Sequence, residues 1–132
     1  MSEENVEIVR RVIDAFNHGD LKGFLADVHP DVESLDDPQV PGGKTLRGRA
    51  EVERFFRSLN RYWESVRLTP ERFVDLGEDV LVLAHMVARS ARGGPEIERP
   101  LDQIVTLRAE KVIRSRILSS RKEALEAAGL RE

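Results

Sequence analysis

Two adjacent carboxylates, Asp36 and Asp37, stand where a strand predicted over about residues 32–36 gives way to a loop rich in proline and glycine. An acid at a strand end, beside a helix-lined cavity, can be kept partly dry and can accept a proton. The same residues also suit a turn, because aspartate side chains hydrogen-bond to nearby backbone groups. A general base and a turn former therefore both stay open as interpretations of this pair.

The histidines do not extend this chemistry. His85 has apolar neighbours, but strand alternation puts Val82, Ala84, Met86 and Ala88 on the inner face and His85 on the outer one. His18 and His29 are expected at helix ends, exposed to solvent. None of the three has the spacing to a second ligand that a metal site requires. The sequence therefore predicts no metal site and no cofactor.

Composition predicts one globular domain over residues 1–132. The chain is 40% hydrophobic and 34% charged, with a formal net charge of -3. Acidic and basic residues are interleaved without a basic stripe, so no nucleic-acid partner is expected. The chain has no cysteine, which excludes disulfides and thiolate sites. With an acidic start and no segment long enough to span a bilayer, the expectation is a cytoplasmic protein without a membrane partner.

Helical periodicity dominates the first half. An apolar stripe at three- and four-residue spacing predicts a first helix that Ser2 caps and Gly19 ends. Asp20 can cap a short second helix, which Pro30 is expected to close. A third helix is predicted over residues 49–63, with its apolar residues on one face.

Strand patterns dominate the second half, near residues 66–74, 80–92, 96–108 and 112–119, and Ser120 with Glu123 predicts the start of a short C-terminal helix. The expected fold class is α+β. Three N-terminal helices would pack on the concave face of a curved, mainly antiparallel sheet, in a cone-shaped α+β barrel with a short C-terminal helix. Such a cone leaves a cavity between the first and third helices and the sheet.

Several segments carry a family resemblance: Ala15–Leu21, His29–Glu33, Leu46–Arg49, Glu98–Pro100 and Ser120–Leu130. Together they resemble the nuclear transport factor 2-like superfamily, specifically its SnoaL-like branch, which is related to polyketide cyclases and ketosteroid isomerases. The resemblance covers almost the whole chain and implies the cone fold. The superfamily includes isomerases, cyclases, epoxide hydrolases, dehydratases and non-catalytic binding proteins, so the fold alone does not choose an activity.

The resemblance implies a role for Asp36. Ketosteroid isomerases of this fold use an aspartate base at the end of the first strand, which falls on Asp36, with Asp37 as the alternative. The positions of their oxyanion-binding tyrosine and second acid fall on Val12 and Gln103. Loss of such a donor costs roughly 3 kcal/mol in barrier terms. Steroid isomerisation is therefore not expected.

The resemblance also implies which side chains face the cavity. It puts Gln103 on the inner face as a polar side chain in an apolar wall, and it turns Arg116 inward, where a guanidinium could pair with Asp36. Against this, Ile113, Ser115 and Ile117 form the more apolar set of the last strand, and a solvated face or a subunit contact also suits Arg116. The candidate catalytic residues are Asp36, Asp37, Gln103 and Arg116. The expected ligand-binding residues are Val12, Phe16, Phe55, Leu59, Trp63, Met86, Val105 and Leu118.

Two classes of function stay open. The first is a cofactor-free isomerase, cyclase or hydrolase that acts on a small apolar molecule, with Asp36 as base. The second is a non-catalytic ligand-binding or dimeric scaffold protein. Related folds commonly pair through the sheet, and an outer face with Leu81, Leu83, His85 and Val87 would suit a homodimer.

Overall fold

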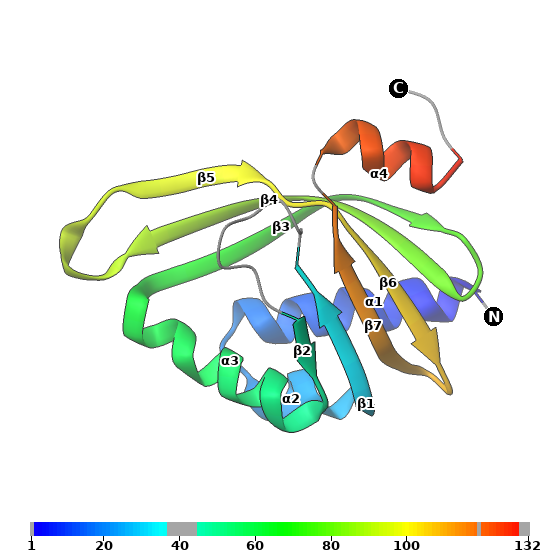
Figure 1. Ribbon diagram of the computed structural model, residues 1–132, viewed down its shortest axis with the longest axis horizontal. Coiled ribbons are helices and arrows are strands. Elements are labelled where there is room, and N and C mark those ends of the chain that lie inside the picture. Colours follow the sequence, from blue (N-terminus) through cyan, green and yellow to red (C-terminus); the bar gives the residue numbers. More distant parts are fainter. Residues whose placement is uncertain (1, 37–44, 119, 130–132) are drawn as a thin grey trace.

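The computed structural model describes residues 2–36, 45–118 and 120–129. The first part holds α1 (Ser2–Asn17), α2 (Leu21–Ala26), β1 (Val28–Leu35), β2 (Thr45–Arg47) and α3 (Arg49–Tyr62). The second part holds β3 (Trp63–Asp75), β4 (Asp79–Ser90), the 3-10 turn η1 (Ala91–Gly93), β5 (Glu96–Pro100), β6 (Gln103–Arg108), β7 (Lys111–Ile117) and α4 (Arg121–Ala127). The seven strands form one curved sheet, with α1, α2 and α3 on one side and α4 on the other (Figure 1). The predicted α+β class is confirmed.

Helix boundaries follow local sequence signals. Gly19 takes φ +68°, a conformation that glycine adopts without steric cost, and ends the first helical segment. The Asp20 carboxylate accepts a hydrogen bond from the Gly23 amide at 2.9 Å, which caps α2 as predicted. The Ser120 hydroxyl accepts one from the Glu123 amide at 3.1 Å and caps α4. The predicted stop at Pro30 is wrong, because α2 ends earlier and Pro30 lies within β1.

One edge of β4 pairs with two different strands. The strand order is β2-β1-β7-β6-β4-β3, and β5 pairs with β4 off this path. Residues 79–82 of β4 pair with β6, whereas residues 85–89 pair with β5. The single strand predicted over residues 96–108 is therefore two strands, separated by Leu101 and Asp102.

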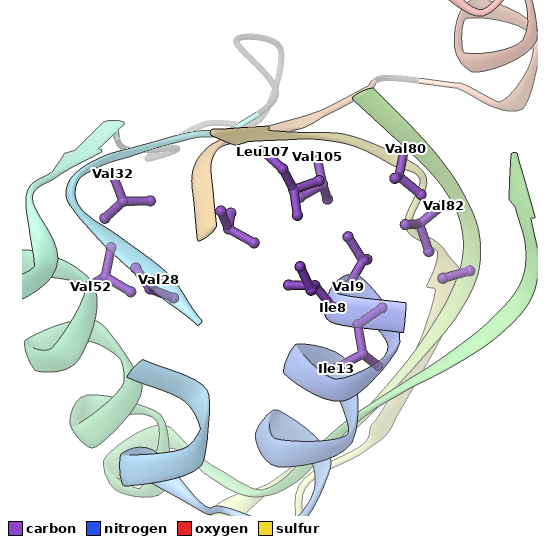
Figure 2. Close-up of a cluster of buried hydrophobic side chains, with 12 residues drawn as sticks. Ile8, Val9, Ile13, Val28, Val32, Val52, Val80, Val82, Val105 and Leu107 are labelled. Carbon is purple, nitrogen blue, oxygen red and sulfur yellow. The ribbon is translucent and has the colours of Figure 1, made fainter. Parts of the chain in front are cut away.

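The main core lies between the inner face of the sheet and the middle of α1, and several of its residues also line the cavity described below. Figure 2 shows side chains of α1, β1, α3, β4 and β6 that point into one shared space. Val80 and Val82 are fully buried, and Val9 is 2% exposed. Burial of such side chains is worth roughly 1.5–3 kcal/mol each, which fixes α1 against the sheet.

The outer face of the sheet carries a second core under α4. Leu81 and Leu83, which alternate with the inward residues of β4, pack with Leu118, Ala124 and Leu125. This corrects the expected dimer face, because α4 covers its two leucines. Pairing of two chains stays a prediction. Of the four residues expected on that face, His85 and Val87 are the two outside the core under α4.

A buried carboxylate joins the divided sheet to α4. Asp102, 2% exposed, accepts hydrogen bonds from Arg121 Nε at 2.8 Å and Nη2 at 3.1 Å. It also accepts one from the Ala84 amide at 3.1 Å, at the point where β4 changes partners. The hydrogen bonds to Asp102 raise the pKa of the Arg121 guanidinium, which therefore stays charged.

Candidate functional site

A cavity of about 340 Å³ lies between the first three helices and the inner face of the sheet. Small-molecule sites in proteins commonly measure roughly 300–1,000 Å³. Phe55 lines this cavity and is nevertheless 48% exposed, so the cavity reaches the protein surface beside α3. The expected hollow is therefore present and accessible from solvent.

The described side chains of the helical wall of the cavity are all apolar. Its lining residues are Val9, Val12, Ile13 and Phe16 of α1, Phe24 of α2, and Val52, Phe55 and Leu59 of α3. The Phe16 ring meets that of Phe56 edge-on at 5.8 Å between centroids, and Phe24 lies 5.1 Å from Phe56. These aromatic contacts connect all three helices behind the cavity, and each is worth roughly 0.5–1.5 kcal/mol beyond area burial.

Within the described part of the chain, the sheet wall is apolar except at Ser34, Gln103 and Ser115, which come from three neighbouring strands. Ser34 of β1 is the register partner of Ser115 of β7. Ser115 is opposite Val105 on β6, and Gln103 is two residues from Val105 on the same strand face. Neighbouring strands lie about 4.8 Å apart, so these side chains form one polar patch on the sheet.

Asn17 fixes the end of α1 against the cavity wall. Its amide nitrogen donates to the Leu68 carbonyl at 2.7 Å, and its amide oxygen accepts from the Leu68 amide at 2.8 Å. The Asn17 side chain thus pairs with the free edge of β3 as another strand would. This contact holds Phe16, the preceding residue, at its place in the wall. No local sequence pattern predicts it, because Asn17 and Leu68 are 51 residues apart.

Seven of the eight expected ligand-binding positions line the cavity: Val12, Phe16, Phe55, Leu59, Trp63, Met86 and Val105. Their binding of a ligand stays a prediction. The expected place of Leu118 is wrong, because this residue is 6% exposed in the outer core under α4. It follows the end of β7, where the chain turns toward α4.

The four catalytic candidates do not come together. Gln103 lines the cavity. Asp36 directly follows β1, is half-buried and continues the alternation of Val32 and Ser34, but it is outside the set of residues that line the cavity. Asp37 lies outside the described residues.

The expected inward position of Arg116 is wrong. A bulge causes the difference: Thr106 pairs with Arg114 but Leu107 pairs with Val112, so Ile113 is the extra residue. The bulge reverses the alternation of β7, and Val112, Ser115 and Ile117 line the cavity while Arg116 is exposed. An Arg116 pair with Asp36 across the cavity is therefore excluded by the strand geometry.

The cavity wall has no charge within the described part of the chain. In residues 2–36, 45–118 and 120–129, no cluster of three or more histidine or acidic side chains is placed to hold a metal ion. Over the same residues, no helix combines the length and apolar character needed to cross a membrane.

Ser34 was not among the residues predicted to line the cavity, because a serine in a strand carries no signal for the face of the sheet that it will occupy.

Comparison with known proteins supports this architecture. The family model for the SnoaL-like domain matches residues 9–115. A nuclear transport factor 2-like protein from Burkholderia xenovorans LB400 is 28% identical, with a TM-score of 0.75 and 97% of each chain covered. TerC, co-crystallised with polyporic acid, is 25% identical, with a TM-score of 0.79, 96% of this chain and 98% of TerC covered.

A nuclear transport factor 2-like protein of unknown function from Burkholderia pseudomallei K96243 is 24% identical, with a TM-score of 0.79, and the match covers 93% of this chain and 95% of that one. No significant match was found among curated protein sequences. Proteins with this fold include polyketide cyclases and isomerases. The chain belongs to the SnoaL-like domain family and has the nuclear transport factor 2-like fold.

Proposed function

We propose that this protein binds a small, largely apolar molecule in the cavity between α1, α3 and the sheet. The observation that carries the proposal is the wall itself: about 340 Å³ of space lined by apolar side chains apart from Ser34, Gln103 and Ser115. Water in such a space gains few hydrogen bonds, so an apolar ligand that displaces it binds favourably. TerC, a chain of similar length and the same fold, was co-crystallised with the small organic molecule polyporic acid, which supports a small-molecule ligand for this chain.

The test is a thermal-shift series with uncharged hydrophobic aromatic ligands. A ligand that binds only the folded state at 100 times its Kd stabilises the protein by about 2.7 kcal/mol. Met86→Trp fills part of the cavity and is expected to abolish the shift. Val87→Trp is the matched control, because Val87 is the next residue of β4, half-buried and outside the cavity lining. The proposal fails if no ligand shifts the wild-type melting temperature, or if Met86→Trp leaves the shifts unchanged.

A second candidate function is proton abstraction from the bound molecule by Asp36. Its support is the position of this acid, two residues beyond the cavity-lining Ser34 on the same strand alternation. A carboxylate at the rim of an apolar space can act as general base on a carbon acid. The absence of charge from the described cavity wall makes ligand binding alone the better-supported function.

Deuterium exchange separates the two functions without knowledge of the substrate. Tetralone carries exchangeable hydrogens beside its carbonyl, and NMR follows their loss in heavy water. If Asp36 acts as base, wild-type protein accelerates the exchange and Asp36→Asn does not, although both bind tetralone. Exchange at the buffer rate with bound wild-type protein would leave binding as the function.

A further inference from the structure

We infer that the ligand of this cavity is an uncharged molecule with one hydrogen-bonding end, and that this end lies against Ser34, Gln103 and Ser115 while the rest of the molecule contacts the helices. The inference rests on the proposed function and specifies its ligand class. It comes from the way in which polar groups are distributed over the wall.

The two walls differ in chemistry. Among the described side chains, every lining residue from α1, α2 and α3 is apolar, and the three polar lining residues lie on β1, β6 and β7. These strands are neighbours in the sheet, in the order β1-β7-β6. A second polar group that lies inside the cavity against the helices would therefore meet hydrocarbon, at a cost in affinity.

The polar patch forms no side-chain hydrogen bond to another described residue, and its partly exposed polar atoms are left to water in the cavity. Among hydrogen bonds between the described residues, none involves the side chain of Ser34, Gln103 or Ser115. All three are half-buried. A purely apolar ligand would strip water from these groups without replacing it, whereas a hydroxyl or carbonyl group would restore their hydrogen bonds.

The patch selects against charge as well. Two serine hydroxyls and one amide can each donate and accept, but none carries a charge to neutralise an ion. Arg116 and Arg114, the nearest cations along β7, are exposed because the bulge at Ile113 turns them away from the cavity. An anionic ligand end would thus be desolvated against neutral groups, which is costly.

The experiment compares three probes on one ring system: naphthalene, a naphthol and a naphthoate, with biphenyl, phenylphenol and biphenyl carboxylate as a second set. Dissociation constants at neutral pH come from calorimetry or fluorescence. We expect the neutral hydroxyl compound to bind roughly tenfold more tightly than the bare hydrocarbon, as one or two net hydrogen bonds allow. The carboxylate is expected to bind at least roughly a hundredfold more weakly than the hydroxyl compound.

Variants test whether the polar patch causes the preference for the hydroxyl compound. The triple variant Ser34→Ala, Gln103→Leu, Ser115→Ala is expected to bind the hydrocarbon at least as tightly as wild type and to lose the tenfold preference for the hydroxyl compound. Each single variant is expected to lose part of it. Ser65→Ala, at an exposed position of β3 outside the cavity lining, is the matched control and keeps the preference.

The outcomes distinguish this inference from the proposed function. If the hydrocarbons bind wild-type protein as tightly as the hydroxyl compounds, or the carboxylates bind as tightly, the inference is overturned and the proposed function stands. A preference that survives in the triple variant, with hydrocarbon binding intact as evidence of a folded cavity, also overturns it. If none of the six probes binds wild-type protein, both are overturned.

Discussion

Replacement of Arg121 by glutamine is expected to destabilise the protein by about 2 kcal/mol without a change in ligand affinity. Breaking a fully buried ion pair by removal of one partner costs about 3–5 kcal/mol, because it leaves an uncompensated charge. Here Asp102 is 2% exposed but the Arg121 side chain is 36% exposed, so water can replace part of the lost guanidinium. The reduced figure corresponds to a fall in melting temperature of roughly 6–10 °C for a domain of this size.

Urea unfolding measures this change, with the slope of free energy against denaturant expected to stay constant. Lys122→Gln is the matched control, since it removes the same charge from the next, exposed residue of α4 and is expected to cost under about 0.5 kcal/mol. Asp102→Asn combined with Arg121→Gln is expected to cost about 1–2 kcal/mol less than the sum of the two single changes, because the residues are in contact. Equal costs for Arg121→Gln and Lys122→Gln, or strict additivity in the double variant, would refute the reasoning.

Two further predictions separate the faces of the sheet. Asn17→Ala removes both hydrogen bonds to the Leu68 backbone and is expected to lower the free energy of unfolding by about 1–3 kcal/mol. Amide exchange at Leu68 is expected to become faster. Asn5→Ala, which loses one exposed hydrogen bond to Gly77, is the control. Leu81→Ala opens space in the core under α4 and is expected to lower the free energy of unfolding in urea by about 2–5 kcal/mol. Ligand affinity is expected to stay within about twofold. A large loss of affinity would contradict the position of Leu81 outside the cavity.

Local signals explain why most elements could be predicted. Asp20 and Ser120 cap helices through bonds that span three residues, so their sequence neighbourhood contains all the necessary information. The alternation of β4 likewise predicts its inner face, and Met86 and Ala88 line the cavity as that pattern requires. β2 was not predicted, because a strand of three residues is too short to give a pattern.

At Pro30, strand pairing overrides the local sequence signal for a boundary. Proline is unfavourable within a paired strand because it has no amide hydrogen to donate. In β1, however, the register with β7 shifts between Val28 and Glu33, and β2 pairs only with residues 33–35. Pro30 therefore lies where the ladder is irregular, and a strand passes through a residue that the sequence pattern takes as a boundary.

The prediction of the site failed at β7 for a related reason. A bulge reverses the side-chain alternation of every residue that follows it, and its position depends on how β6 and β7 pair. One extra residue, Ile113, exchanges Arg116 for Ser115 and Ile117 at the cavity wall. That exchange puts a neutral side chain where a cation is predicted from the sequence, and so changes the class of ligand that we propose for the cavity.

The division of β4 between two partners links the cavity to the outer face. At Ala84 the strand passes from β6 to β5, and its carbonyl accepts from the Leu101 amide at 2.9 Å. The amide of Ala84 would lack a partner at this point, and the Asp102 carboxylate supplies one. Leu101 then lines the cavity while Asp102, the next residue, faces outward to Arg121. The buried Asp102 carboxylate thus completes the hydrogen bonding at the point where β4 changes partners. The cavity beside it can remain uncharged, because strand alternation turns this acid to the opposite face of the sheet.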